Sequence, residues 1–229
     1  MSIPFLPVPL SHLRIRFIGI SKGKKMKRMT TLVVLTIAAT VMAVPLQVQI
    51  TAPGAYYDYQ ATVVSGPIGI YGVGETFRTF CLERHENSSN GIFDVVLGDR
   101  AMDGGVEPAG TGDPLDTKTA FLYNEFLNGG LAAYGIVSDS ASYTIMQNVI
   151  WEIEGDGNVI GLGAGTIGGN LLSYAAANAD GSNYGIKVMV MHTATGAKAQ
   201  DMPVKFAIPE PMTVALLGLG GVLLIRNKK

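Results

Sequence analysis

The sequence is poor in cysteine and histidine, and these shortages exclude several kinds of site. Its 229 residues contain one cysteine, Cys81, so a framework of internal disulfides cannot form. The three histidines, His12, His85 and His192, are too few for a histidine-based zinc centre. On a straight strand Cys81 and His85 would lie roughly 13 Å apart, so only a bend could make them a nucleophilic pair. No other catalytic constellation stands out, so we expect no enzymatic activity, no cofactor and no metal site.

Basic residues are scarce in the middle of the chain. Of the 17 lysines and arginines, seven lie in residues 1–43 and three lie after residue 206, which leaves seven between residues 44 and 206. Since 17 of the 18 acidic residues also lie between residues 44 and 206, that segment carries a net charge of −10. So acidic a segment argues against nucleic acid and anionic membrane surfaces as partners.

The N-terminal region has the pattern of a secretory leader. Residues 26–43 comprise a short basic start, an apolar stretch and small residues before a plausible cleavage point after Ala43. We therefore predict a signal peptide at 26–43. Residues 1–25 then either precede the true start of translation, at Met26 or Met29, or form an extended leader. Export exposes the protein to an oxidising compartment, where the lone Cys81 is buried, reactive, paired between molecules or otherwise consumed.

The last residues, 208–229, combine three features in a fixed order. Pro209, Glu210 and Pro211 precede an uncharged stretch from Met212 to Ile225, and Arg226 opens a basic tip. This order resembles the PEP-CTERM sorting signal of Gram-negative bacteria. The resemblance implies recognition by an exosortase, a membrane protease, and delivery to the cell surface or extracellular matrix. The apolar stretch is shorter than the roughly 20 residues of a typical spanning helix, which suits temporary anchoring in the inner membrane. The alternative is a buried C-terminal helix of a soluble domain.

Residues 44–207 are expected to form one exported, β-rich α+β domain with two or three inserted helices. Alternating apolar and polar residues predict strands at 46–51, 59–64, 75–82, 92–97, 184–191 and 203–208. Both faces of 75–82 are partly apolar, so we expect this strand to be central. The Gly-rich, acidic stretch 98–114 is expected to be a long loop. Helices are predicted from Asp116 to Gly129, over 143–154 after Asp139 or Ser140, and over 168–180.

The helix at 143–154 places a glutamine between two aromatic residues. Tyr143 and Trp151 lie one turn before and one turn after Gln147. With Phe80-Cys81, this helix resembles the thioester domains of bacterial surface adhesins over residues 76–155. In that family a cysteine after an aromatic residue cross-links to the glutamine of a Thr-Gln-x-Ala-x-Trp helix. Here methionine (residue 146) replaces the threonine and valine (residue 149) replaces the alanine of that motif.

The resemblance implies a thioester between Cys81 and Gln147, sheltered from water by Phe80, Tyr143 and Trp151. Such a bond would be attacked by a surface nucleophile or an extracellular polysaccharide, giving an adhesive or structural protein covalently attached to its target. The alternative is that Cys81 is a small buried hydrophobe and Gln147 a hydrogen-bonded amide. The protein would then be an exported carbohydrate-binding or structural domain.

One further pattern concerns calcium. Glu154, Asp156 and Asn158 alternate with glycines, as in the first half of a calcium-binding loop. The second half, with its bidentate glutamate, is missing. We therefore expect a solvated turn at this position.

Overall fold

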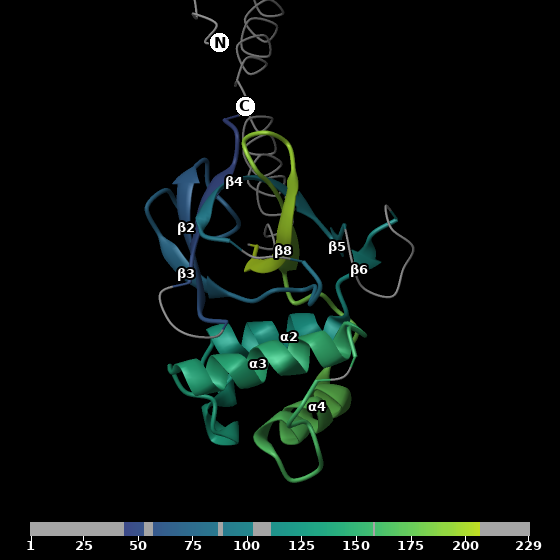
Figure 1. Ribbon diagram of the computed structural model, residues 1–229. Coiled ribbons are helices and arrows are strands. Elements are labelled where there is room, and N and C mark those ends of the chain that lie inside the picture. The colour runs from purple at the N-terminus through teal and green to yellow at the C-terminus, as the bar shows by residue number, and fades with distance from the viewer. Residues whose placement is uncertain (1–43, 53–56, 87–88, 103–110, 158, 207–229) are drawn as a thin grey trace, which may run out of the picture. The chain divides into compact units, whose positions relative to one another are not determined.

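The structure is a computed structural model that describes residues 44–52, 57–86, 89–102, 111–157 and 159–206 (Figure 1). The chain divides into two units, residues 1–43 and 44–229, and the fold below belongs to the second. The predicted signal peptide and the sorting segment with Pro209, Glu210, Pro211 and Arg226 lie outside the described residues. Among the residues that are described, no helix has the length and apolar character needed to cross a membrane.

The strands form one antiparallel sheet and one small pair. The six-stranded sheet has the order β3 (Thr76–Thr79), β2 (Tyr59–Ser65), β1 (Gln47–Thr51), β4 (Gly91–Gly98), β7 (Ile186–His192) and β8 (Lys198–Lys205). The pair consists of β5 (Arg100–Ala101) and β6 (Asp113–Pro114), within the stretch predicted to be a loop. Strands β1, β2, β4 and β7 agree closely with the sequence prediction. Strand β8 begins five residues earlier than predicted.

The sheet curls until its two ends meet. The Thr79 hydroxyl donates to the Pro203 carbonyl at 2.8 Å, and the Leu82 amide donates to the Asp201 carbonyl at 3.0 Å. The prediction of a central strand at 75–82 was therefore wrong, because β3 ends the strand order and stops at Thr79. The apolar residues that suggested a second buried face, Phe80 and Leu82, lie beyond the end of β3 and pack in the core between the sheet and the helices.

Three α-helices and a 3-10 helix are present in the described residues. They are α2 (Thr117–Leu127), η1 (Gly130–Tyr134), α3 (Ser140–Ile153) and α4 (Ile167–Asn178). As predicted, the side chain of Asp116 caps α2. Asp139, one of the two residues expected to precede the next helix, caps α3, and each carboxylate accepts a main-chain N–H at 2.7 Å. Figure 1 shows α2 and α3 side by side below the strands, with α4 on their far side. The α+β prediction is confirmed for this part of the chain.

Buried side chains form two clusters. The barrel core lies inside the curled sheet and includes Val48, Ile50, Phe77, Cys81, Phe93, Trp151, Met189 and Met202. The helix core lies between the sheet and the helices and includes Phe80, Leu122, Tyr123, Tyr143, Met146, Val149, Ile150 and Leu171. The two clusters share the segment Phe80–Leu82 and helix α3, whose residues contribute to both. The predicted thioester residues therefore lie where barrel and helices join.

Candidate functional site

The structure brings Cys81 and Gln147 together through two hydrogen bonds. The main-chain N–H of Cys81 donates to Oε1 of Gln147 at 2.8 Å, and Nε2 of Gln147 donates to the Cys81 carbonyl at 2.7 Å. Both residues are buried, with 2% of Cys81 and 0% of Gln147 exposed. The carboxamide thus lies against the main chain of the residue that bears the thiol.

The end of β3 leaves the Cys81 main chain available to a side chain. Strand β3 ends at Thr79, and the following residues leave the ladder and run beside β8, where the Leu82 amide finds its partner. A buried amide and carbonyl must be bonded elsewhere, since leaving each unpaired costs about 1–3 kcal/mol. Gln147 supplies both partners at once, so it fixes the position of this segment against α3.

The three aromatic residues expected to shelter the glutamine are all buried. Tyr143 is 4% exposed, Trp151 is 5% exposed and Phe80 is 1% exposed. The Phe80 ring contacts Phe126 at 5.1 Å between centroids, and Phe126 contacts Tyr143 at 6.0 Å. Trp151 belongs to the barrel core together with Cys81. The surroundings of the pair are therefore largely apolar on both sides of the junction.

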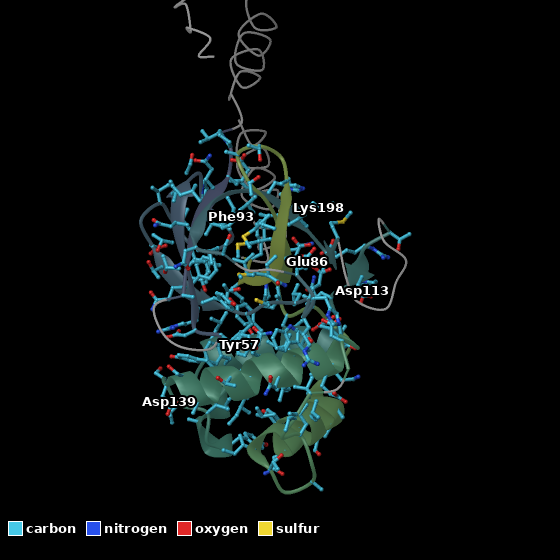
Figure 2. The ribbon with its side chains drawn as sticks, in the orientation of Figure 1. Tyr57, Glu86, Phe93, Asp113, Asp139 and Lys198 are labelled. Carbon is cyan, nitrogen blue, oxygen red and sulfur yellow. The ribbon has the colours of Figure 1, made fainter. Side chains whose placement is uncertain are left out.

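A short stretch after β1 covers two of these rings. Tyr57, labelled in Figure 2 where the strands approach the helices, meets the Trp151 ring edge-on at 5.0 Å. Its neighbour Asp58 forms an ion pair with Arg78, whose guanidinium lies 4.6 Å from the centroid of the Tyr143 ring. Tyr57 has a φ of 60°, in the left-handed region that non-glycine residues seldom adopt. Tyr57 therefore covers Trp151 directly, and Asp58 binds the guanidinium that covers Tyr143.

Arg84 contacts Trp151 from another direction. Its guanidinium carbon lies 5.9 Å from the ring centroid, and its Nη1 donates to the Gly157 carbonyl at 2.7 Å. Its main-chain N–H donates to Asp156 Oδ2 at 2.7 Å. Sequence reasoning missed the contributions of Tyr57, Asp58, Arg78 and Arg84, because they depend on residue pairs far apart in the chain and follow no local pattern.

The other sequence candidates are not assembled into a site. His85 is exposed, whereas Cys81 is buried. In the Glu154–Asn158 stretch, Asp156 accepts from Arg84, and Glu154 accepts from the main-chain N–H of Asp116 at 3.3 Å, so the two carboxylates do not converge on one centre. Over the part of the chain that is described, no three His, Cys, Asp or Glu side chains are grouped to hold a metal ion.

Glu154 has an unusual protonation equilibrium that the sequence did not predict. Burial raises the pKa of its carboxyl to about 7, although the hydrogen bond from the Asp116 N–H favours the charged form. It ends α3, two turns after Gln147, and bonds to the residue that caps α2. The carboxyl therefore links the ends of two helices and changes charge near neutral pH.

Comparison with known proteins gives little to add to this geometry. No protein-family model matches the chain, and no curated protein sequence matches it. Among solved structures it is similar to the N-terminal thioester domain of a surface protein from Clostridium perfringens, determined as a cysteine-to-alanine variant. The TM-score is 0.45 at 9% identity, over 71% of this chain and 99% of that one. At this score and identity the likeness carries no argument about function.

Proposed function

We propose that residues 44–207 form an attachment module of the cell surface or extracellular matrix, in which Cys81 and Gln147 form an internal thioester. The observation that carries this proposal is the pair of hydrogen bonds that seat the Gln147 carboxamide on the Cys81 main chain. They hold the electrophilic carbon beside the residue that bears the nucleophilic sulfur, in a buried enclosure. Positioning of this kind supplies much of the rate of an intramolecular reaction.

The bond-forming step uses only these two residues. Sγ of Cys81 attacks Cδ of Gln147, the C–N bond breaks, and the thiol proton leaves with the amide nitrogen as ammonia. Negative charge develops on Oε1, which accepts the Cys81 N–H at 2.8 Å. A main-chain donor aimed at a developing oxyanion stabilises the tetrahedral intermediate. The low exposure of Phe80, Tyr143 and Trp151 keeps water from the product.

Attachment is a second acyl transfer. An amine on a neighbouring surface, or a hydroxyl of an extracellular polysaccharide, attacks the thioester carbonyl and the C–S bond breaks. The proton of the nucleophile passes to the Cys81 sulfur, so the thiol is regenerated while the target is joined to Gln147 by an amide or ester bond. Each molecule reacts once, so the protein is an attachment reagent without turnover.

Intact mass spectrometry of the exported protein tests the proposal. We expect wild type to be lighter than its processed sequence by one ammonia, and Cys81→Ala and Gln147→Ala to have their full sequence masses. Methylamine should add to wild type and expose one alkylatable thiol. Full mass, with a thiol that is alkylated after unfolding without methylamine treatment, would show that the hydrogen bonds serve as a non-covalent clamp. The protein would then be the exported carbohydrate-binding or structural domain of the alternative.

The sorting part of the proposal rests on the C-terminal segment. Pro209, Glu210 and Pro211 are the site that an exosortase would recognise, and the apolar stretch before Arg226 would hold the precursor in the inner membrane until processing. Replacing Glu210 by alanine in a host with an exosortase should leave the protein in the inner-membrane fraction, while wild type reaches the cell surface or matrix. Equal surface delivery of both proteins would contradict this assignment.

A further inference from the structure

Residues of η1 and α4 line a shallow groove. Helix α4 lies on the side of α2 and α3 away from the strands (Figure 1). The volume of the groove is about 350 Å³. The lining consists of two tyrosines, two asparagines, a serine and an alanine: Tyr134, Asn170, Ser173, Tyr174, Ala177 and Asn178. Five of these occupy one face of α4, at the three- and four-residue spacing of a helix. The groove is separate from the Cys81–Gln147 site.

Two tyrosine rings form a supported platform in this groove. The rings of Tyr134 and Tyr174 lie 4.5 Å apart between centroids at an angle of 31°. Tyr174 packs on Phe121 at 5.2 Å, and Phe121 packs on Tyr184 at 5.4 Å. Both groove tyrosines remain partly exposed although they rest on this aromatic base. The platform is therefore held in place before any ligand binds.

Hydrogen-bonding groups surround the platform. The Ser173 hydroxyl donates to the Gly169 carbonyl at 2.9 Å, which leaves its oxygen lone pairs as acceptors. Nδ2 of Asn178 donates to the Tyr174 carbonyl at 2.9 Å, which leaves Oδ1 and a second N–H facing solvent. Asn170 adds an exposed carboxamide with both donors and acceptors. The groove therefore combines aromatic faces with neutral donors and acceptors.

Charge further restricts the ligand. No lysine or arginine lines the groove, and the Glu125 carboxylate shares a hydrogen bond with Tyr174 at its edge. Residues 44–206 carry a net charge of −10, so an anionic ligand would approach against repulsion. The same charge would attract a cation, but the nearby Glu125 carboxylate already interacts with Tyr174, and the residues that line the groove offer a cation no charged partner. A neutral polyhydroxylated molecule fits all of these features.

We propose that this groove binds a neutral saccharide. The C–H face of a sugar ring packs on the Tyr134 ring, on the side turned away from Tyr174, because a π face carries partial negative charge. The sugar hydroxyls exchange hydrogen bonds with Asn170, Ser173 and Asn178, the few placed polar groups that orient a ligand in such a site. This site would hold a glycan without a covalent bond, whether or not the thioester forms.

Titration calorimetry of the full-length exported protein carrying Cys81→Ala tests this proposal without covalent attachment. The probes are maltohexaose, cellohexaose and xylohexaose as neutral oligosaccharides, with an alginate hexamer as the anionic comparison. We expect at least one neutral probe to bind more tightly than the alginate. Tyr134→Ala should weaken that binding by about tenfold through loss of a ring contact. Asn170→Ala should weaken it as well, and Gln49→Ala, exposed on β1, should leave it unchanged.

A second substitution separates loss of the platform from loss of the fold. Tyr134→Phe keeps the ring and should bind like its parent, so rescue by this variant ties the loss to the aromatic face. The proposal is overturned if none of the neutral probes binds, if the alginate hexamer binds most tightly, or if Tyr134→Ala and Asn170→Ala bind as their parent does. These outcomes are independent of the thioester, because every protein compared lacks the thiol.

Discussion

Replacing Gln147 by glutamate should convert the Cys81–Gln147 contact into a pH-dependent one. A protonated carboxyl keeps both hydrogen bonds, because it can accept the main-chain N–H at position 81 and donate its O–H to the carbonyl there. An ionised carboxylate has no proton to donate, so its second oxygen would face the carbonyl oxygen at close range. Burial also disfavours the charge, since Gln147 is 0% exposed. Both effects raise the pKa of the introduced carboxyl in the folded state.

The raised pKa sets the direction and the size of the change in the stability of Gln147→Glu with pH. Because the folded state holds the proton more tightly than the unfolded state, the hydrogen bonds are fully present below the free glutamate pKa of about 4.3. As pH rises, the variant loses about 1.4 kcal/mol per pH unit relative to its parent, until pH reaches the folded pKa. A carboxyl that stays protonated to neutrality would therefore cost up to about 4 kcal/mol at pH 7.

Urea unfolding between about pH 4 and pH 7 measures this difference. Both proteins should carry Cys81→Ala, so that no thioester links the strand segment to α3. Titration of Glu154 is common to variant and parent and cancels in the comparison. Gln49→Glu, on an exposed position of β1, serves as the matched control. Its unfolding free energy relative to the parent should change little with pH. If the difference in unfolding free energy between Gln147→Glu and its parent is the same at every pH in this range, the hydrogen bond from Gln147 Nε2 to the Cys81 carbonyl is refuted.

Two further predictions concern the surroundings of the pair. The pKa of Glu154 is raised from 4.5 to about 7, so wild type loses stability as pH rises between these values, and Glu154→Gln should be more stable above pH 7 by up to about 3 kcal/mol. Thermal or urea unfolding should show the two proteins converging below about pH 4.5, and a difference that does not change with pH would contradict the shift. Tyr57→Ala removes the edge contact on Trp151, so methylamine incorporation should accelerate by up to about tenfold, measured by mass spectrometry over time. An unchanged rate would show that the nucleophile enters by another route.

Elements set by local chemistry could be predicted from the sequence. Asp116 and Asp139 cap their helices through N–H groups two and three residues ahead, which is a short-range interaction. The end of β3 could not be predicted, because the alternating pattern continues to Leu82 while the Cys81 main chain bonds to a side chain 66 residues away. The alternation of apolar and polar residues cannot show that the main chain of one residue bonds to a distant side chain in place of a neighbouring strand.

The early start of β8 was missed for a related reason. Residues 198–202 look polar enough for a loop, yet Asp201 is only 2% exposed. Its carboxylate accepts the Met191 N–H at 3.1 Å and the Met102 N–H at 2.7 Å, so a buried charge is bonded to main chain on two sides. Sequence alone cannot show which buried carboxylates find such donors. The sequence could place Tyr143 and Trp151 one turn on either side of Gln147 because all three lie on the same helix, whereas the contact of Tyr57 with Trp151 depends on the folded chain.

The chain differs at two positions of α3 from the motif that it resembles, and both positions are buried. Met146 and Val149, which replace threonine and alanine, are fully buried in the helix core rather than in the barrel core. A side chain on Gly168 of α4 would come within 3.5 Å of Val149, so this face of α3 is shaped by the packing of α4. Gln147, by contrast, is hydrogen-bonded to the Cys81 main chain, and Trp151 lies in the barrel core. Val149 therefore lies at the contact between α3 and α4, whereas Gln147 lies at the contact with the Cys81 main chain.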